Sequence, residues 1–99
     1  MDSAELKRAC ALAGIETRNG AYEHFSVNVD GTWLRWSNSG VQPYVASVLV
    51  GRIRSTQSAA LYHAYGKALR NMRRYPENAT DEQRIRAAVA ALESQEAGG

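Results

Sequence analysis

The chain has 99 residues, a formal net charge of +2 and a hydrophobic fraction of 44%. This length accommodates one domain (1–99), and the apolar content favours a folded chain over a disordered one. A core of this size leaves little room for an enclosed active-site cavity. The single cysteine, Cys10, excludes an intramolecular disulfide, which favours a reducing compartment.

The N-terminal residues include Asp2 and Glu5, where a secretory signal would carry basic residues followed by a long apolar stretch. The most apolar window, from Val45 to Val50, is too short to cross a bilayer. We therefore expect a cytoplasmic protein without a membrane partner.

The charges are distributed unevenly along the chain. Every Asp and Glu lies at or before Asp30, or at or after Glu77. The segment between them carries only cations, namely Arg35, Arg52, Arg54, Lys67, Arg70, Arg73 and Arg74. This asymmetry predicts a basic surface.

A short helix and a β-hairpin are predicted in the N-terminal part. The helix runs from Asp2, a capping residue with Glu5 three positions on, to Ala13. The hairpin has strands at about 22–29 and 32–37, joined by Asp30-Gly31 as a type I′ turn. A two-residue loop fixes the register, so that the following pairs face each other: Val29 and Thr32, Val27 and Leu34, Phe25 and Trp36.

Two neighbouring segments stay ambiguous. Asn19-Gly20 could form a second tight turn and add a strand over 15–18, although this register would set Glu16 against Glu23. The segment 43–54 matches a helix face and has Pro43 at its start, but its β-branched residues also suit a strand. We favour the helix.

The C-terminal half is predicted to be helical. One helix spans 56–75, with Ser55 or Thr56 as its cap and Pro76 after its end. Another spans 80–95 and begins with a capping box formed by Thr80 and Gln83. The expected fold class is therefore α+β.

The surface of the 56–75 helix is the first candidate binding site. His63, Lys67, Arg70 and Arg74 follow at spacings of four, three and four, and Arg73 lies beside them. A partner with phosphates or carboxylates would offset their mutual repulsion. The alternative is that acids of the same chain neutralise the row, namely Glu77, Asp81, Glu82 and Glu93.

The polar face of the hairpin is the second candidate. Trp33 beside Arg35 has the composition of a binding hot spot or a base-stacking platform, unless a helix covers that face and Trp33 belongs to the core. Trp36 should be core because it faces Phe25. An open hairpin edge could also form a homodimer by strand addition.

A search for catalytic groups finds no candidate. Cys10 lies on the apolar side of its helix, which predicts an unreactive thiol. His24 and His63 have no Cys or carboxylate at metal-ligand spacing, and no glycine-rich phosphate loop follows a strand. We expect no enzyme activity, no metal and no cofactor.

No family motif matches the sequence. Its size, single-domain layout and lack of catalytic groups resemble small phage and mobile-element accessory proteins, including inhibitors of bacterial defence systems. The leading hypothesis is a binding or inhibitor protein that uses its basic helix face and its hairpin to dock on an acidic protein surface or a nucleoprotein complex. The alternatives are direct nucleic-acid binding and a homodimeric accessory protein. The predicted contact residues are His63, Lys67, Arg70, Arg73, Arg74, Trp33, Arg35, Arg52 and Arg54.

Overall fold

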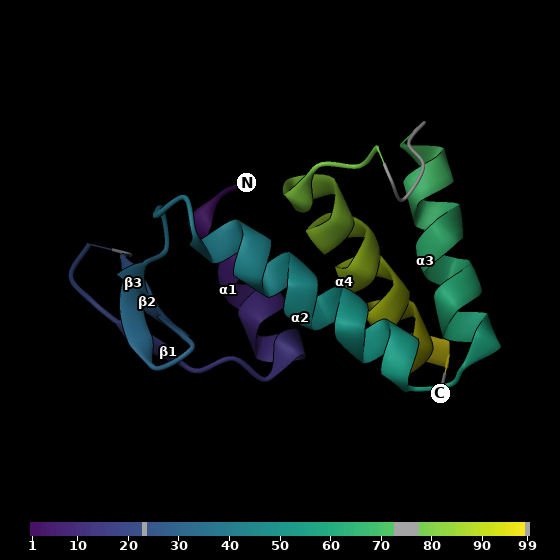
Figure 1. The fold of residues 1–99 in the computed structure, drawn as a ribbon, viewed down its shortest axis with the longest axis horizontal. Coiled ribbons are helices and arrows are strands. Elements are labelled where there is room, and N and C mark those ends of the chain that lie inside the picture. The colour runs from purple at the N-terminus through teal and green to yellow at the C-terminus, as the bar shows by residue number, and fades with distance from the viewer. Residues whose placement is uncertain (23, 73–77, 99) are drawn as a thin grey trace.

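The computed structural model describes residues 1–22, 24–72 and 78–98. This part of the chain is an α+β fold with a three-stranded antiparallel sheet at one end and helices toward the other (Figure 1). In chain order the elements are α1 (Ser3–Ala13), β1 (Thr17–Asn19), β2 (Phe25–Val29), β3 (Thr32–Arg35), α2 (Val41–Ser55), α3 (Ala59–Asn71) and α4 (Asp81–Gly98).

Helix α1 begins and ends as its sequence predicts. The Asp2 carboxylate accepts a hydrogen bond from the Glu5 amide at 2.8 Å. Gly14 adopts a left-handed conformation with φ of 72°, and the amide of Ile15 bonds back to the Cys10 carbonyl at 2.9 Å. This cap turns the chain from α1 toward the first strand.

The predicted hairpin is confirmed, with slightly shorter strands. Asp30 and Gly31 both have positive φ, and β2 pairs with β3 in the expected register. Beyond the end of β3, the Trp36 amide donates to the Phe25 carbonyl at 3.0 Å, and the two rings stack with centroids 6.2 Å apart. Trp36 itself is half-buried, so the expectation that it belongs to the core was only partly met.

The first strand differs from the prediction. β1 ends at Asn19 and pairs Thr17 with Val27, and β2 begins only at Phe25, so Asn19-Gly20 is not a two-residue turn. In this register the Asn28 amide donates to the Glu16 carbonyl at 3.0 Å, and its side-chain amide donates to the Glu16 carboxylate at 3.5 Å. Glu16 thus lies beside a hydrogen-bond donor, which is a favourable pairing. Its predicted neighbour Glu23 lies outside the described residues.

The ambiguous segment 43–54 lies within helix α2. Its buried residues follow helical spacing: Val41, Val45, Ala46, Leu49 and Ile53. This stripe packs against α1 and α4 and also contacts β2 and α3, which makes α2 the element that joins the two ends of the molecule. Burial on several sides explains the β-branched content that resembled a strand.

Helix α3 starts later than predicted. The hydroxyls of Ser55 and Thr56 donate to the Arg52 and Ile53 carbonyls, so these residues close α2 instead of capping α3. Gln57 then takes a positive φ of 56°, and Ser58 caps α3 by accepting from the Leu61 amide at 3.2 Å. The helix ends at Asn71, and the predicted end at Tyr75 and Pro76 lies outside the described residues.

The capping box of α4 is confirmed. The Thr80 hydroxyl accepts from the Gln83 amide at 3.2 Å, and the Gln83 side chain accepts from the Thr80 amide at 3.0 Å. Behind this cap, α4 buries Ile85 and the small side chains of Ala87, Ala88 and Ala91. These alanines allow α4 to approach both α2 and α3, its two largest contacts.

We expect Thr80→Ala to lower the free energy of unfolding by about 1 kcal/mol, because an amide at the start of α4 loses its acceptor. Thr80→Ser retains the hydroxyl and should cost less than about 0.5 kcal/mol. Urea denaturation of the two variants measures the difference. Equal losses would show that the hydroxyl does not stabilise the helix.

Candidate functional site

The outer surface of α3 presents three of the predicted basic residues. His63, Lys67 and Arg70 are exposed, and the buried residues of the helix, Leu61, Tyr65 and Leu69, lie on its other side. We call His63, Lys67 and Arg70 the α3 face; it extends about 10 Å along the helix. The predicted residues Arg73 and Arg74 lie outside the described residues.

The acids that could have neutralised this face bind elsewhere. Three of them make ion pairs on other elements: Glu82 with the N-terminal ammonium and Arg86, Glu93 with Arg8, and Asp81 with Arg84. The hydrogen bond from the N-terminal ammonium holds the pKa of Glu82 below its usual value. The fourth, Glu77, lies outside the described residues. Within the described ranges, no carboxylate pairs with the α3 face.

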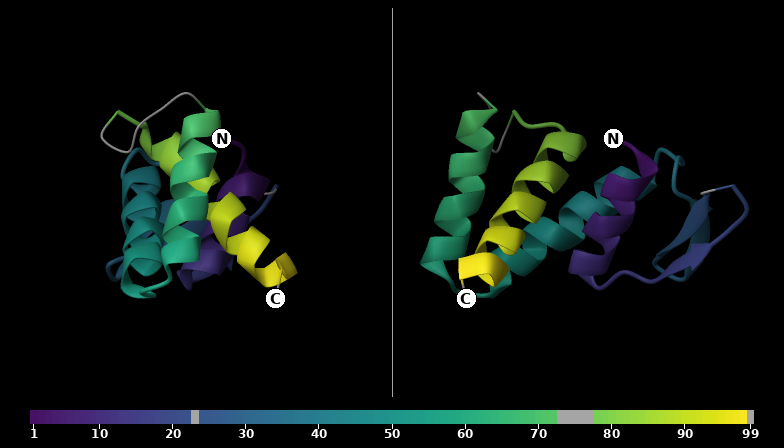
Figure 2. Two further views of the ribbon diagram at one scale, coloured as in Figure 1. Left: turned by 90° about the vertical axis from the view of Figure 1, so that its right-hand side faces the viewer. Right: turned by 180° about the vertical axis from the view of Figure 1, so that it is seen from behind.

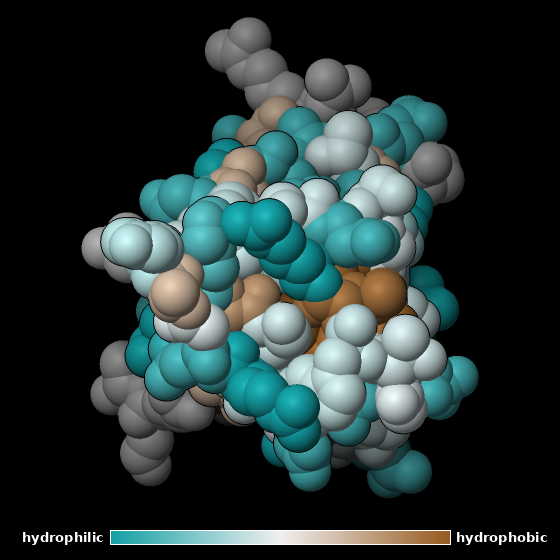
Figure 3. All heavy atoms as spheres, turned by 90° about the vertical axis from the view of Figure 1, so that its left-hand side faces the viewer, coloured by the Kyte–Doolittle hydropathy of each residue, from teal (hydrophilic) through white to brown (hydrophobic). Residues whose placement is uncertain are grey.

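The outer face of the sheet carries a second exposed group. The Arg18 guanidinium lies over the Trp33 ring, 4.2 Å from its centroid, and Trp33 is 36% exposed. Register places Arg18 beside Ser26 and Ser26 beside Arg35, so the two cations flank β2. Trp33 is therefore not a core residue. The surface at this end is mostly polar, and the most hydrophobic residues gather near the centre of the view (Figure 3).

Sequence reasoning missed Arg18 because it set the first strand in another register. Only the observed pairing of Thr17 with Val27 brings Arg18 to the row of Ser26 and within reach of Trp33. The contributing strand was suspected from Asn19-Gly20, but the turn signal pointed to a shorter connection than the one that forms.

Helix α3, which carries the α3 face, and the sheet lie at opposite ends of the molecule (Figure 1, Figure 2). The longest extent of the structure is 39 Å, and α2 runs between the two ends. The helix face and the hairpin thus form two separate surfaces instead of the single docking surface that the sequence suggested.

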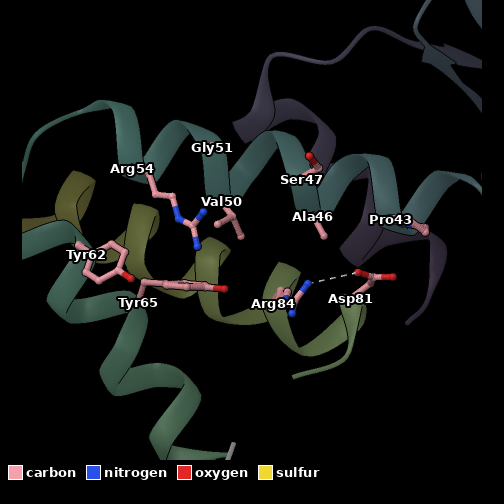
Figure 4. Close-up of a pocket in the computed structure, with 10 residues that line it drawn as sticks. All are labelled: Pro43, Ala46, Ser47, Val50, Gly51, Arg54, Tyr62, Tyr65, Asp81 and Arg84. Atoms are coloured by element: carbon pink, nitrogen blue, oxygen red, sulfur yellow. Dashed lines mark ion pairs between the residues drawn. The ribbon is translucent and has the colours of Figure 1, made fainter. Parts of the chain in front are cut away.

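The two arginines near the end of α2 have different positions. Arg52 donates to the Leu12 carbonyl at 2.7 Å and so satisfies a carbonyl at the end of α1. Arg54 points into a pocket between α2, α3 and α4, toward Tyr65 and Arg84 (Figure 4). Arg52 therefore has a structural role, whereas Arg54 belongs to a pocket.

Cys10 and His24, the other residues considered for catalysis or metal binding, have structural positions in the fold. Cys10 is fully buried, and burial raises the pKa of its thiol to about 11. The Nδ1 atom of His24 accepts from the Trp36 indole at 3.3 Å. Across the described ranges, no three His, Cys, Asp or Glu side chains gather in a way that could hold a metal ion.

Comparison of the chain with protein-family models, with curated proteins and with solved structures finds no match. In the part of the chain that the structure describes, no helix combines the length and the apolar character needed to cross a membrane. Function is therefore inferred from the surfaces and the pocket.

Arg52→Ala should lower the free energy of unfolding by about 1 kcal/mol, because the Leu12 carbonyl exchanges a charged hydrogen-bond donor for water. Arg35→Ala, which removes an exposed arginine from the sheet, should change it by less than about 0.5 kcal/mol. Chemical denaturation compares the two. If both variants had the same stability, the contact with α1 would contribute nothing measurable.

Cys10 should make stability depend on pH in the alkaline range. Its pKa is 9.0 when exposed and about 11 in the fold, so the unfolded chain binds fewer protons between these values. The free energy of unfolding should therefore decrease as the pH rises from 9.0 to about 11. Cys10→Ala should show a smaller decrease in urea titrations across this range, and an unchanged slope would contradict the assignment.

Proposed function

We propose that this protein is a non-enzymatic binding protein whose α3 face docks on an acidic surface of a larger macromolecule. One observation supports this most directly: the described carboxylates that could neutralise the α3 face pair with other cations. An uncompensated row of cations on a helix costs stability, and an anionic partner reverses that cost on binding.

The residues around the α3 face suit a protein partner. Tyr62 is 48% exposed on the same helix, and Arg70 lies near Gly66, four residues beyond Tyr62. A Cβ atom at Gly66 would stand 3.8 Å from the Arg70 guanidinium, so the arginine folds back along the helix toward the tyrosine. Tyrosine and arginine are enriched among residues that dominate binding energy, and the cations would speed the encounter.

The partner class that we propose is a nucleic-acid-handling complex, for example one that serves bacterial defence. Such a nucleoprotein complex presents carboxylates and phosphates together, and both are attracted to Lys67 and Arg70. A small cytoplasmic chain that blocks such a surface would act as an inhibitor.

Direct nucleic-acid binding is a second candidate function, and a different surface favours it. Trp33 is exposed beneath the Arg18 guanidinium, and Arg35 lies on the same face of the sheet. An exposed aromatic ring flanked by cations is a suitable platform for an unpaired base. A homodimer formed by strand addition at the outer edge of β1 or β3 is a further alternative, which size-exclusion chromatography would reveal.

Charge reversal tests the α3 face against the sheet. The wild-type protein serves as bait in its host extract, and the dissociation constant of each captured partner is then measured calorimetrically. We expect Lys67→Glu combined with Arg70→Glu to weaken binding by more than about tenfold, because attraction becomes repulsion. The matched variant Arg18→Glu with Arg35→Glu should change it by less than about twofold, since it alters the opposite end.

If the sheet variant weakened binding and the α3 variant did not, the sheet would be the docking surface and docking through α3 would be overturned. Mobility shifts with a single-stranded and a duplex oligonucleotide at two salt concentrations decide the nucleic-acid alternative. Each phosphate contacted on duplex DNA should contribute about −0.9 to the log–log salt slope. Absence of binding at low salt would eliminate that alternative.

A further inference from the structure

A pocket of about 370 Å³ lies between α2, α3 and α4 (Figure 4). Its volume falls within the range of small-molecule sites. The polar groups come from all three helices, and the apolar wall comes from α2. The lining residues that bear on its chemistry are Val50, Gly51, Arg54, Tyr65, Asp81 and Arg84.

Donors converge at one end of this pocket. The Tyr65 hydroxyl points into the space between the guanidinium groups of Arg54 and Arg84 (Figure 4). Burial raises the pKa of Tyr65, whereas the positive charges of Arg84 and Arg54 act in the opposite direction, as expected if both lie near the hydroxyl. Within the described ranges, Arg54 has no ion-pair partner. An anion placed here would receive donors from two different helices and the tyrosine.

Gly51 gives an independent indication that this space is kept open. It lies inside the 15-residue helix α2, where glycine is less favourable than alanine because the unfolded chain loses more conformational freedom. No close neighbour explains the choice, since a Cβ atom at this position would meet nothing within 4 Å. Gly51 lines the pocket, so the lack of a side chain at this position adds to its open space. The glycine lowers the helix propensity of α2 and borders the open space of the pocket.

The other end of the pocket has different chemistry. The Asp81 carboxylate lies there, 4.0 Å from Arg84, and would repel a second anionic group. It can instead accept a hydrogen bond from a hydroxyl or amine. Between the two ends, Ala46 and Val50 provide apolar contact. The matching ligand has one anionic head and an uncharged organic part that carries hydrogen-bond donors.

We propose that the pocket between α2, α3 and α4 binds a small phosphomonoester. Its phosphate accepts hydrogen bonds from Arg54, Arg84 and the Tyr65 hydroxyl, and its organic part lies along Val50 toward Asp81. A phosphate has the three terminal oxygens and the charge to use two guanidinium groups and a hydroxyl together, which a carboxylate cannot fully match. This site goes beyond the proposed function, because the groups that would hold the phosphate, namely Arg54, Arg84 and Tyr65, are not residues of the α3 face; Tyr62 borders both surfaces.

Isothermal titration with ribose 5-phosphate, inorganic phosphate and ribose tests the site. We expect ribose 5-phosphate to bind most tightly, inorganic phosphate more weakly, and ribose not to bind at ~10 mM. Arg54→Ala should weaken ribose 5-phosphate at least about tenfold, and Tyr65→Phe about threefold or more, because each removes a donor to the phosphate.

Gly51 supplies variants that preserve the fold. Gly51→Leu fills the pocket and should abolish binding while the melting temperature stays equal or rises, since leucine favours a helix. Gly51→Ala adds one methyl group and should retain most of the affinity. The Lys67→Glu and Arg70→Glu variant should bind ribose 5-phosphate normally, which separates this site from the α3 face.

Four outcomes would overturn the proposal. One is the absence of ribose 5-phosphate binding, and another is binding that Gly51→Leu leaves unchanged. The third is equal affinity for inorganic phosphate, which would remove the role given to Val50 and Asp81. A phosphoserine peptide that binds more tightly than ribose 5-phosphate would likewise replace the small-molecule ligand by a phosphorylated protein.

Discussion

The buried stripe of α2 is the constraint on which the rest of the structure depends. Val41, Val45, Leu49 and Ile53 are almost fully buried, and α2 contacts α1, α3, α4 and β2. A 15-residue helix is about 22 Å long, so it sets the distance between the sheet and α3. The outer faces of the sheet and of α3 are exposed because α2 supplies the central packing and neither of these two elements does.

The ion pairs follow from the same arrangement. With α1 lying beside α4, Glu5, Glu82 and Arg86 meet on one surface and compensate one another. The acidic residues paired on that surface are not available to α3, which lies on the other side of α4 from α1. Each exposed pair contributes little to stability, because water and salt screen its charges. The larger consequence of these ion pairs is that, among the described residues, Lys67 and Arg70 have no acidic partner.

Local signals predicted what local contacts decide. The two-residue turn at Asp30-Gly31 and the Thr80 capping box each involve a few adjacent residues, and both were confirmed. The predicted start of α3 was wrong because Ser55, Thr56 and Ser58 can all cap a helix. The sequence does not reveal at which of them α2 ends and α3 begins. The pocket was missed for a different reason: its donors come from three helices, whose relative placement depends on tertiary packing.

One helix therefore combines two roles on two of its sides. The buried stripe of α2 holds the fold together, whereas Gly51 and Arg54 on the pocket side contribute nothing to that core. A residue that weakens its helix without serving the packing is hard to explain by stability alone. Of the five stripe residues, Ala46 also lines the pocket, whereas Leu49 and Ile53 do not. Selection could therefore alter what the pocket holds without disturbing the contacts of Leu49 and Ile53. The glycine in the middle of the main structural helix is then explained by the space beside it.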